Sequence, residues 1–145
     1  MAWVRRMIRL AGMVSLGIMG CAASAGTAAA AHVGESAFIG TWINPRGTVA
    51  VETRACGAAL CGRVSWAAAQ AQQDAADAGV RALVGTEILQ DFRPAASGRW
   101  EGTVFVPDMG RSFQSIIAMQ DAGRMRVSGC ILGRWICKSQ VWRRL

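Results

Sequence analysis

The sequence has one histidine and no tyrosine, and this scarcity limits the chemistry open to the protein. The histidine, His32, lies at an expected processing point near the N-terminus. A catalytic triad or a metal cluster built on histidine is therefore not available to the folded domain. Nucleophilic catalysis by cysteine needs a free thiol, and the cysteines have another expected role, as bridges in an exported domain.

Acidic residues are also few, with nine Asp and Glu residues in the chain. A hydrolase with paired carboxylates needs two of them in one cleft. The candidates Glu87, Asp91, Glu101 and Asp108 lie in strand-like segments or in a turn, which predicts solvated side chains and a turn former. We therefore expect a protein that is not an enzyme, with no catalytic residues, no cofactor and no metal site.

The N-terminal segment has the three parts of a secretory signal. Arginines come first, then an apolar run over residues 10–19, then small residues from Gly20 to Ala31. The apolar run is shorter than the ~20 residues that span a bilayer. We expect cleavage after Ala31 and a periplasmic or secreted product. The alternative is a lipobox at residues 18–21, with the chain lipid-anchored to the envelope through Cys21.

One small domain remains after cleavage, with residues 32–37 expected to be a flexible N-terminus and residues 38–145 the folded part. The net charge of +7 includes three signal arginines. Without them, 13 basic and 9 acidic residues remain, a net charge of +4. That mild excess does not predict a nucleic-acid partner.

The four cysteines after the signal are an even set, which in a small exported domain indicates disulfides. Zinc is the alternative, but their spacings fit common zinc knuckles poorly. Strand alternation places both members of each close pair with the polar residues of its hairpin. We predict the disulfides Cys56–Cys61 and Cys130–Cys137, with pairing between the two hairpins left open.

Short strand-like segments separated by turn signals fill the rest of the chain. The segment "AAAQAQQDAADAGVRAL" differs, and it predicts a short helix or long loop between the third and fourth strands. Eight antiparallel strands at this spacing favour an all-β closed barrel or a sandwich. The expected strands are residues 38–43, 48–55, 60–66, 84–92, 99–106, 111–119, 124–130 and 136–144.

Several blocks in order carry a family resemblance: "FIGTWINPRG", "CGAALCGRVSW", "LVGTEILQDF", "GRWEGTVFVPDMGRSF" and "RMRVSGCILGRWICKSQVWRRL". Together they resemble the exported bacterial family called domain of unknown function 2147. The resemblance implies an antiparallel eight-stranded lipocalin-like barrel and no established activity. The chain departs from the family pattern in its middle segment, which lacks the usual Asn-Pro loop, and in the tip "VPDMG", which lacks the first aspartate.

The tryptophans are candidates for the barrel interior. The resemblance implies that Trp42 plugs one barrel end, with Arg143 or Arg144 stacked on it as a cation–π partner. Trp66 and Trp100 either pack in the core or line an apolar ligand pocket.

The last strand breaks a simple apolar pattern. If Trp142 faces inward, strict alternation also turns Lys138, Gln140 and Arg144 inward, where polar groups need partners. Either a bulge near Ser139 and Gln140 changes the facing, or Lys138 and Gln140 contact a ligand. The sequence thus predicts a binder of a small apolar or amphipathic ligand or of an envelope component. The alternative is a structural or protein-interaction module with a filled barrel.

Native mass spectrometry of protein purified from its own periplasm tests the processing and the sulfur chemistry. We expect a chain that begins at His32 and lacks four thiol hydrogens. A lipid on Cys21 would favour the lipobox, and a chain that keeps residues 1–31 or four free thiols would contradict the prediction.

Overall fold

The computed structural model describes residues 34–131 and 136–145. The predicted signal, His32 and Cys21 lie outside these residues. Within the described part, no helix is long and apolar enough to cross a membrane.

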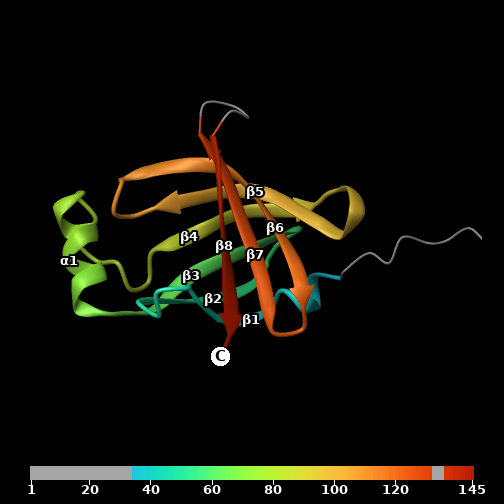
Figure 1. Cartoon of the computed structure of the whole chain (residues 1–145), viewed down its shortest axis with the longest axis horizontal. Helices are drawn as coiled ribbons and strands as arrows, with labels where there is room; N and C mark the ends of the chain where they lie inside the picture. Colours follow the sequence, from blue (N-terminus) through green and yellow to red (C-terminus); the bar gives the residue numbers. More distant parts are fainter. Residues whose placement is uncertain (1–33, 132–135) are drawn as a thin grey trace, which may run out of the picture.

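The described chain forms a closed barrel of eight antiparallel strands in sequence order, as predicted (Figure 1). Each strand pairs with the next along the chain, and β1 pairs with β8 through Trp42 opposite Arg144. This last pairing removes both sheet edges. The strands are β1 (Gly40–Ile43), β2 (Val49–Cys56), β3 (Ala59–Ala67), β4 (Glu87–Pro94), β5 (Arg99–Val106), β6 (Arg111–Asp121), β7 (Arg124–Ile131) and β8 (Ile136–Arg144).

The segment between β3 and β4 contains the predicted short helix, α1 (Ala69–Asp77). Strand β4 begins three residues later than expected. A turn carries the chain over residues 83–86, where the amide of Thr86 donates to the carbonyl of Leu83 and Gly85 has a φ of 90°. A positive φ of this size favours glycine, so Gly85 delays the strand.

The antiparallel order separates the turns into two ends of the barrel (Figure 1). One end holds the β1–β2, β3–β4 and β5–β6 connections together with α1, and we call it the open end. The other holds the β2–β3, β4–β5 and β6–β7 connections, the 3₁₀ turn η1 (Glu35–Ala37) and the C-terminus, and we call it the closed end.

Fully buried aromatic side chains fill the closed end. Trp42 donates its indole N–H to the Phe38 carbonyl at 2.9 Å and lies 3.2 Å from the Thr53 hydroxyl oxygen. That hydroxyl also reaches the carbonyls of Phe38 and Gly40. The Phe38 ring packs on Trp100 with ring centroids 5.6 Å apart. We call this cluster of Trp42, Phe38, Thr53 and Trp100 the plug. The N–H of the buried Trp42 indole therefore has its hydrogen-bond partners within the plug.

Arg144 covers this plug. Its guanidinium carbon lies 4.2 Å from the centroid of the Trp42 ring. Its nitrogens donate to the carbonyls of Ala37 at 2.6 Å, Ile39 at 2.7 Å and Ala122 at 2.9 Å. A side chain on Gly40 would collide with this guanidinium, which explains a glycine there.

Of the two arginines predicted to cap Trp42, only Arg144 does so. Arg143 lies opposite Ile43 and Arg124 on the outer face and is exposed. Strand alternation is the reason, since neighbours on one strand point to opposite faces.

The turn that supplies the Ala122 carbonyl is held by Asp121. Its carboxylate accepts from Arg124 Nε at 2.6 Å and from the Gly123 amide at 2.9 Å. The hydrogen bond from Arg124 is the main reason that the pKa of Asp121 lies below its ordinary value. The ion pair is exposed to solvent, so its role is to shape the turn.

Residues 34–37 of the segment expected to be a flexible N-terminus lie in the described chain. There η1 packs at the closed end, and Arg144 binds the Ala37 carbonyl. Residues 32 and 33 lie outside the described part.

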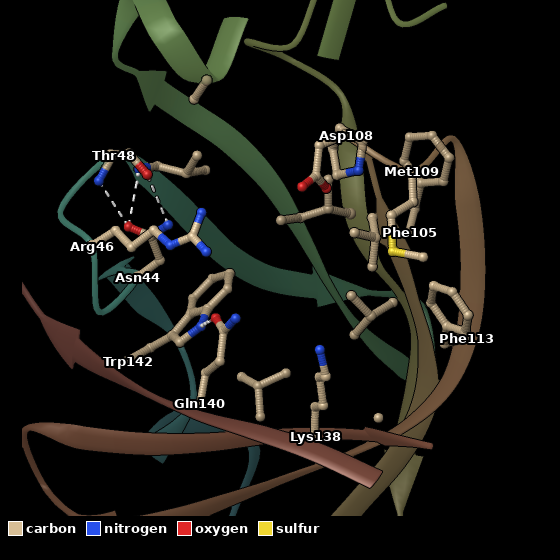
Figure 2. A pocket seen from close by; sticks show the side chains of 18 of the residues that line it. Asn44, Arg46, Thr48, Phe105, Asp108, Met109, Phe113, Lys138, Gln140 and Trp142 are labelled. Carbon is tan, nitrogen blue, oxygen red and sulfur yellow. Dashed lines mark hydrogen bonds between the residues drawn. The ribbon is translucent and has the colours of Figure 1, made fainter. Parts of the chain in front are cut away.

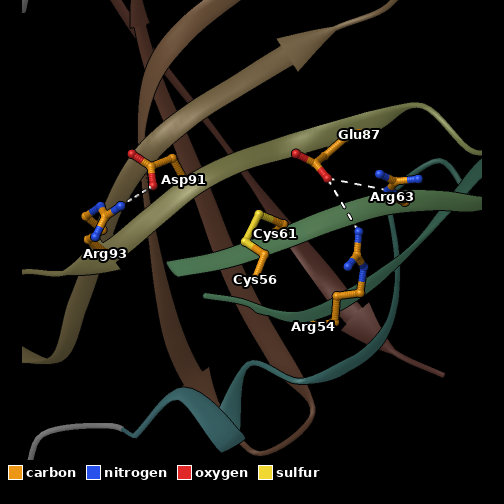
Figure 3. Close-up of a disulfide and its surroundings, with 7 residues drawn as sticks. All are labelled: Arg54, Cys56, Cys61, Arg63, Glu87, Asp91 and Arg93. Atoms are coloured by element: carbon orange, nitrogen blue, oxygen red, sulfur yellow. Dashed lines mark hydrogen bonds and ion pairs between the residues drawn. A yellow bond between two sulfur atoms is a disulfide. The ribbon is translucent and has the colours of Figure 1, made fainter. Parts of the chain in front are cut away.

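Both predicted disulfides are confirmed, one at each end of the barrel. Cys56–Cys61 closes the β2–β3 turn at the closed end, beside exposed ion pairs of Glu87 with Arg54 and Arg63 (Figure 3). Cys130–Cys137 joins directly opposed residues of β7 and β8. These bonds are consistent with an exported protein.

The variant Arg144→Ala is expected to lower the free energy of unfolding by about 3 kcal/mol, because it removes charged hydrogen bonds and the contact with Trp42. The matched variant Arg143→Ala removes an exposed neighbour and is expected to change it by less than about 0.5 kcal/mol. Urea denaturation of both measures the difference, and equal losses would contradict the role given to Arg144.

Candidate functional site

The open half of the barrel holds a cavity of about 520 Å³ (Figure 2). Strands β2 and β4–β8, α1 and three connecting turns contribute to its wall. Trp142 lies between this cavity and the closed end, because it follows Lys138 and Gln140 on the inner face of β8 and precedes Arg144. One strand therefore supplies both the cover of the plug and part of the cavity wall.

Most of the cavity wall is apolar. Phe105, Phe113 and Met109 gather on the side formed by β5, β6 and their turn (Figure 2). The remaining apolar lining comes from Val49, Leu83, Ile88, Val104, Val106, Val127 and Trp142. An apolar lining with a few polar groups is typical of small-molecule sites.

Lys138 and Gln140 face this cavity, as strict alternation in the last strand predicts. The pairing of β7 with β8 runs without a register shift from Arg124 opposite Arg143 to Ile131 opposite Ile136. The alternative of a bulge near Ser139 is therefore wrong. Gln140 accepts a hydrogen bond from the Trp142 indole at 3.2 Å, so its orientation is fixed.

The Lys138 ammonium points into the cavity (Figure 2). Among residues 34–131 and 136–145, no hydrogen bond or ion pair engages it. The residue is exposed, so the space around its ammonium is open to solvent. The cavity thus has a cation that is available to a ligand.

Small residues lie across the strands beside Lys138. Gly129 is opposite Lys138, Ser115 is opposite Gly129, and Gly102 is opposite Ser115. A side chain at Gly129 would approach the Ser115 hydroxyl to 3.0 Å, and one at Gly102 would collide with Phe92. This row leaves room next to the lysine, and it explains the glycines in two strand interiors.

Polar side chains surround the mouth of the cavity. Asn44 shapes the β1–β2 turn, since its side-chain oxygen accepts from the amides of Thr48 at 2.8 Å and Val49 at 3.2 Å. That turn presents Arg46 and the β5–β6 turn presents Asp108 (Figure 2). Helix α1 contributes Asp74 to the lining. The mouth therefore carries charges of both signs.

Helix α1 lies at this mouth and is anchored there by Ala75, which is fully buried. Just after the helix, the Ala78 carbonyl lies close to Gly110 of the β5–β6 turn. The alanines and glutamines of this segment gave no functional signal in the sequence, and Asp74 and Ala71 were missed as lining residues. Their role depends on where the helix packs, which local pattern does not specify.

Trp66 neither packs in the core nor lines either hollow, so both alternatives predicted for it are wrong. The pairing of β2 with β3 shifts between Ala50 and Val51, which leaves Ser65 as an extra residue. Trp66 is therefore turned to the outer face, where it is 50% exposed. A β-bulge of this kind reverses the facing of every later residue in the strand.

Trp100 is buried but does not line this cavity. It packs against Phe38 at the closed end, where it borders a separate hollow of about 350 Å³ with Glu35 and Arg99. Of the four residues predicted to bind ligand, Lys138 and Gln140 are the two that meet in the open cavity.

The acidic residues do not form a cluster. In the part of the chain that the structure describes, no three His, Cys, Asp or Glu side chains are placed to hold a metal ion. Asp91 and Glu101 are exposed strand residues, and Glu87 pairs with two arginines on the outer face. Asp108 lies in a turn, as expected.

Comparisons with known proteins agree with this geometry. The sequence model of a bacterial family, described as uncharacterised proteins conserved in bacteria and designated domain of unknown function 2147, matches residues 40–144. The fold is similar to that of protein HP1028 from Helicobacter pylori, which belongs to the lipocalin family. The two chains are 13% identical with a TM-score of 0.59, over 74% of this chain and 82% of the other. No curated protein matches the sequence.

Replacing either pair of disulfide cysteines with serine is expected to lower the free energy of unfolding by about 2 kcal/mol, because each bridge closes a short loop. Only the Cys130→Ser/Cys137→Ser variant is expected to speed amide exchange at Gly129 and Lys138, which lie next to that bridge. Hydrogen exchange measured by NMR separates the two variants. Equal exchange at these amides in both would contradict a local role for the bridge.

Proposed function

We propose that this chain, which belongs to the domain of unknown function 2147 family, binds a small apolar or amphipathic molecule in the open half of its barrel. The single observation that carries the proposal is the cavity of about 520 Å³. Its volume lies within the range of about 300–1,000 Å³ typical of small-molecule sites. Barrels of eight strands are also wide enough for one small ligand.

The shape of the interior supports a binding protein over a structural module. A barrel that served only as a scaffold would fill both halves with side chains, as the closed end does with Trp42 and Phe38. The open half instead leaves apolar side chains such as Val104 and Phe113 facing free space. Removing apolar surface of this kind from water is favourable, so it stabilises the complex with a ligand.

A binding role without catalysis also fits the polar groups of the site. Asp74 and Asp108 lie at the mouth on separate elements, and the interior polar groups are an ammonium, an amide and the Ser115 hydroxyl. This set can orient a ligand, and the Ser115 hydroxyl donates to the Phe113 carbonyl at 3.0 Å and is not paired with a base. We therefore place the protein among binders and not among enzymes.

The proposed place of action is the periplasm or the medium outside the cell. Two disulfides support export, because such bonds persist in oxidising compartments. Anchoring through a lipid on Cys21 is the alternative form, and it would hold the same barrel at the envelope.

Fluorescence titration with N-phenyl-1-naphthylamine, a neutral apolar dye that brightens away from water, tests the proposal. The protein is expected to bind one dye molecule per chain with micromolar affinity. Val104→Trp is expected to weaken binding at least tenfold, because an indole there would occupy the cavity. Val104→Phe gives a milder version if the larger variant is unstable.

Trp66→Ala is the matched control, because it removes a large apolar side chain from the outer face. We expect this variant to bind the dye as the parent does. No saturable binding by the folded parent protein, or a larger loss in Trp66→Ala than in the Val104 variants, would overturn the proposal.

A further inference from the structure

We propose that the ligand carries an acid group, a carboxylate or a phosphate, which pairs with the Lys138 ammonium while the apolar part of the ligand lies against the β5–β6 side of the cavity. This inference rests on the proposed function and adds the charge and the orientation of the ligand.

The position of the lysine is the first support. Lys138 lies in a regular part of β8, where the pairing with Gly129 and the neighbouring Cys130–Cys137 bridge fix its facing. Its side chain enters the cavity with no ion-pair partner among the described residues. A lysine that served only solubility would face outward, as Arg143 does on the same strand.

The space beside the ammonium is the second support. Gly129 lies opposite Lys138 and Ser115 lies opposite Gly129, so the two positions nearest the lysine in this row carry no large side chain. The Gln140 amide nitrogen is an additional donor, because the Trp142 indole engages only the amide oxygen. An ammonium with a neighbouring amide donor suits a group that has several acceptor oxygens.

The rest of the cavity suits the other end of such a molecule. Phe113 and Met109 lie on the β5–β6 side of the cavity, and Phe113 is next to the row of small residues beside Lys138 (Figure 2). An alkyl or ring system against them would be removed from water while its acid group remained at the cation. The site therefore matches an amphipathic anion better than a neutral apolar molecule.

Arg46 is the second cation of the cavity, and it is the rival for the acid group. It is exposed on the β1–β2 turn, and the mouth also carries the carboxylates of Asp74 and Asp108. A ligand acid at the mouth would meet these negative charges. Lys138, in contrast, extends from a strand into the cavity, and no carboxylate engages it in the described residues.

Competition against bound N-phenyl-1-naphthylamine tests the inference with two probes that share one chain length, dodecanoate and 1-dodecanol. The quantity measured is the ratio of the dissociation constant of the alcohol to that of the acid. Lys138→Met keeps the length of the side chain and removes its charge, and it is expected to lower this ratio about tenfold. Lys138→Arg keeps the charge and is expected to retain most of the ratio.

Arg46→Met is the matched control and is expected to leave the ratio within about twofold of the parent value. An unchanged ratio in Lys138→Met, or a loss in Arg46→Met alone, would overturn the inference while the dye and both probes still bound. Failure of the dye and both probes to bind the parent protein would instead overturn the proposed function itself. Far-ultraviolet circular dichroism of each variant confirms that the barrel is folded.

Discussion

The contact of Arg144 with Trp42 determines how the rest of the barrel is arranged. The guanidinium covers the buried indole and binds carbonyls of η1, of the residue before β1 and of the β6–β7 turn. It therefore ties the end of the last strand to the start of the first, where β1 and β8 share only a short pairing. Closing this end with large aromatic side chains leaves the opposite half of the interior free.

Alternation along β8 then connects the plug to the cavity. Arg144, Trp142, Gln140 and Lys138 all face inward, so the strand passes from the closed end to the open end with one side chain at each level. The polar residues that broke the apolar pattern of this strand are the ones that reach free space. Burying them without partners would cost free energy, and the open cavity removes that cost.

Much of this fold could be predicted from local pattern. Strand alternation and turn residues gave the eight strands and the pairing of Cys56 with Cys61, and the even cysteine count favoured bridges. The failures have a common cause, which is that a bulge or a packing contact cannot be seen in alternation alone. One extra residue at Ser65 turned Trp66 outward, and the burial of Ala75 placed α1 at the mouth. Sequence alternation correctly placed Lys138 and Gln140 in the cavity, because β8 is regular there. It did not predict Ala71 and Asp74, because the packing of α1 brings these residues to the cavity.

The central claim is that the open half of the barrel is a ligand site with a polar contact at Lys138. A crystal structure of the protein grown with dodecanoate tests this most directly. Electron density for the ligand chain is expected against Val104 and Phe113, with a carboxylate oxygen about 2.8 Å from the Lys138 ammonium. A cavity filled by the protein's own side chains, or a ligand bound on the outer face near Trp66, would contradict it.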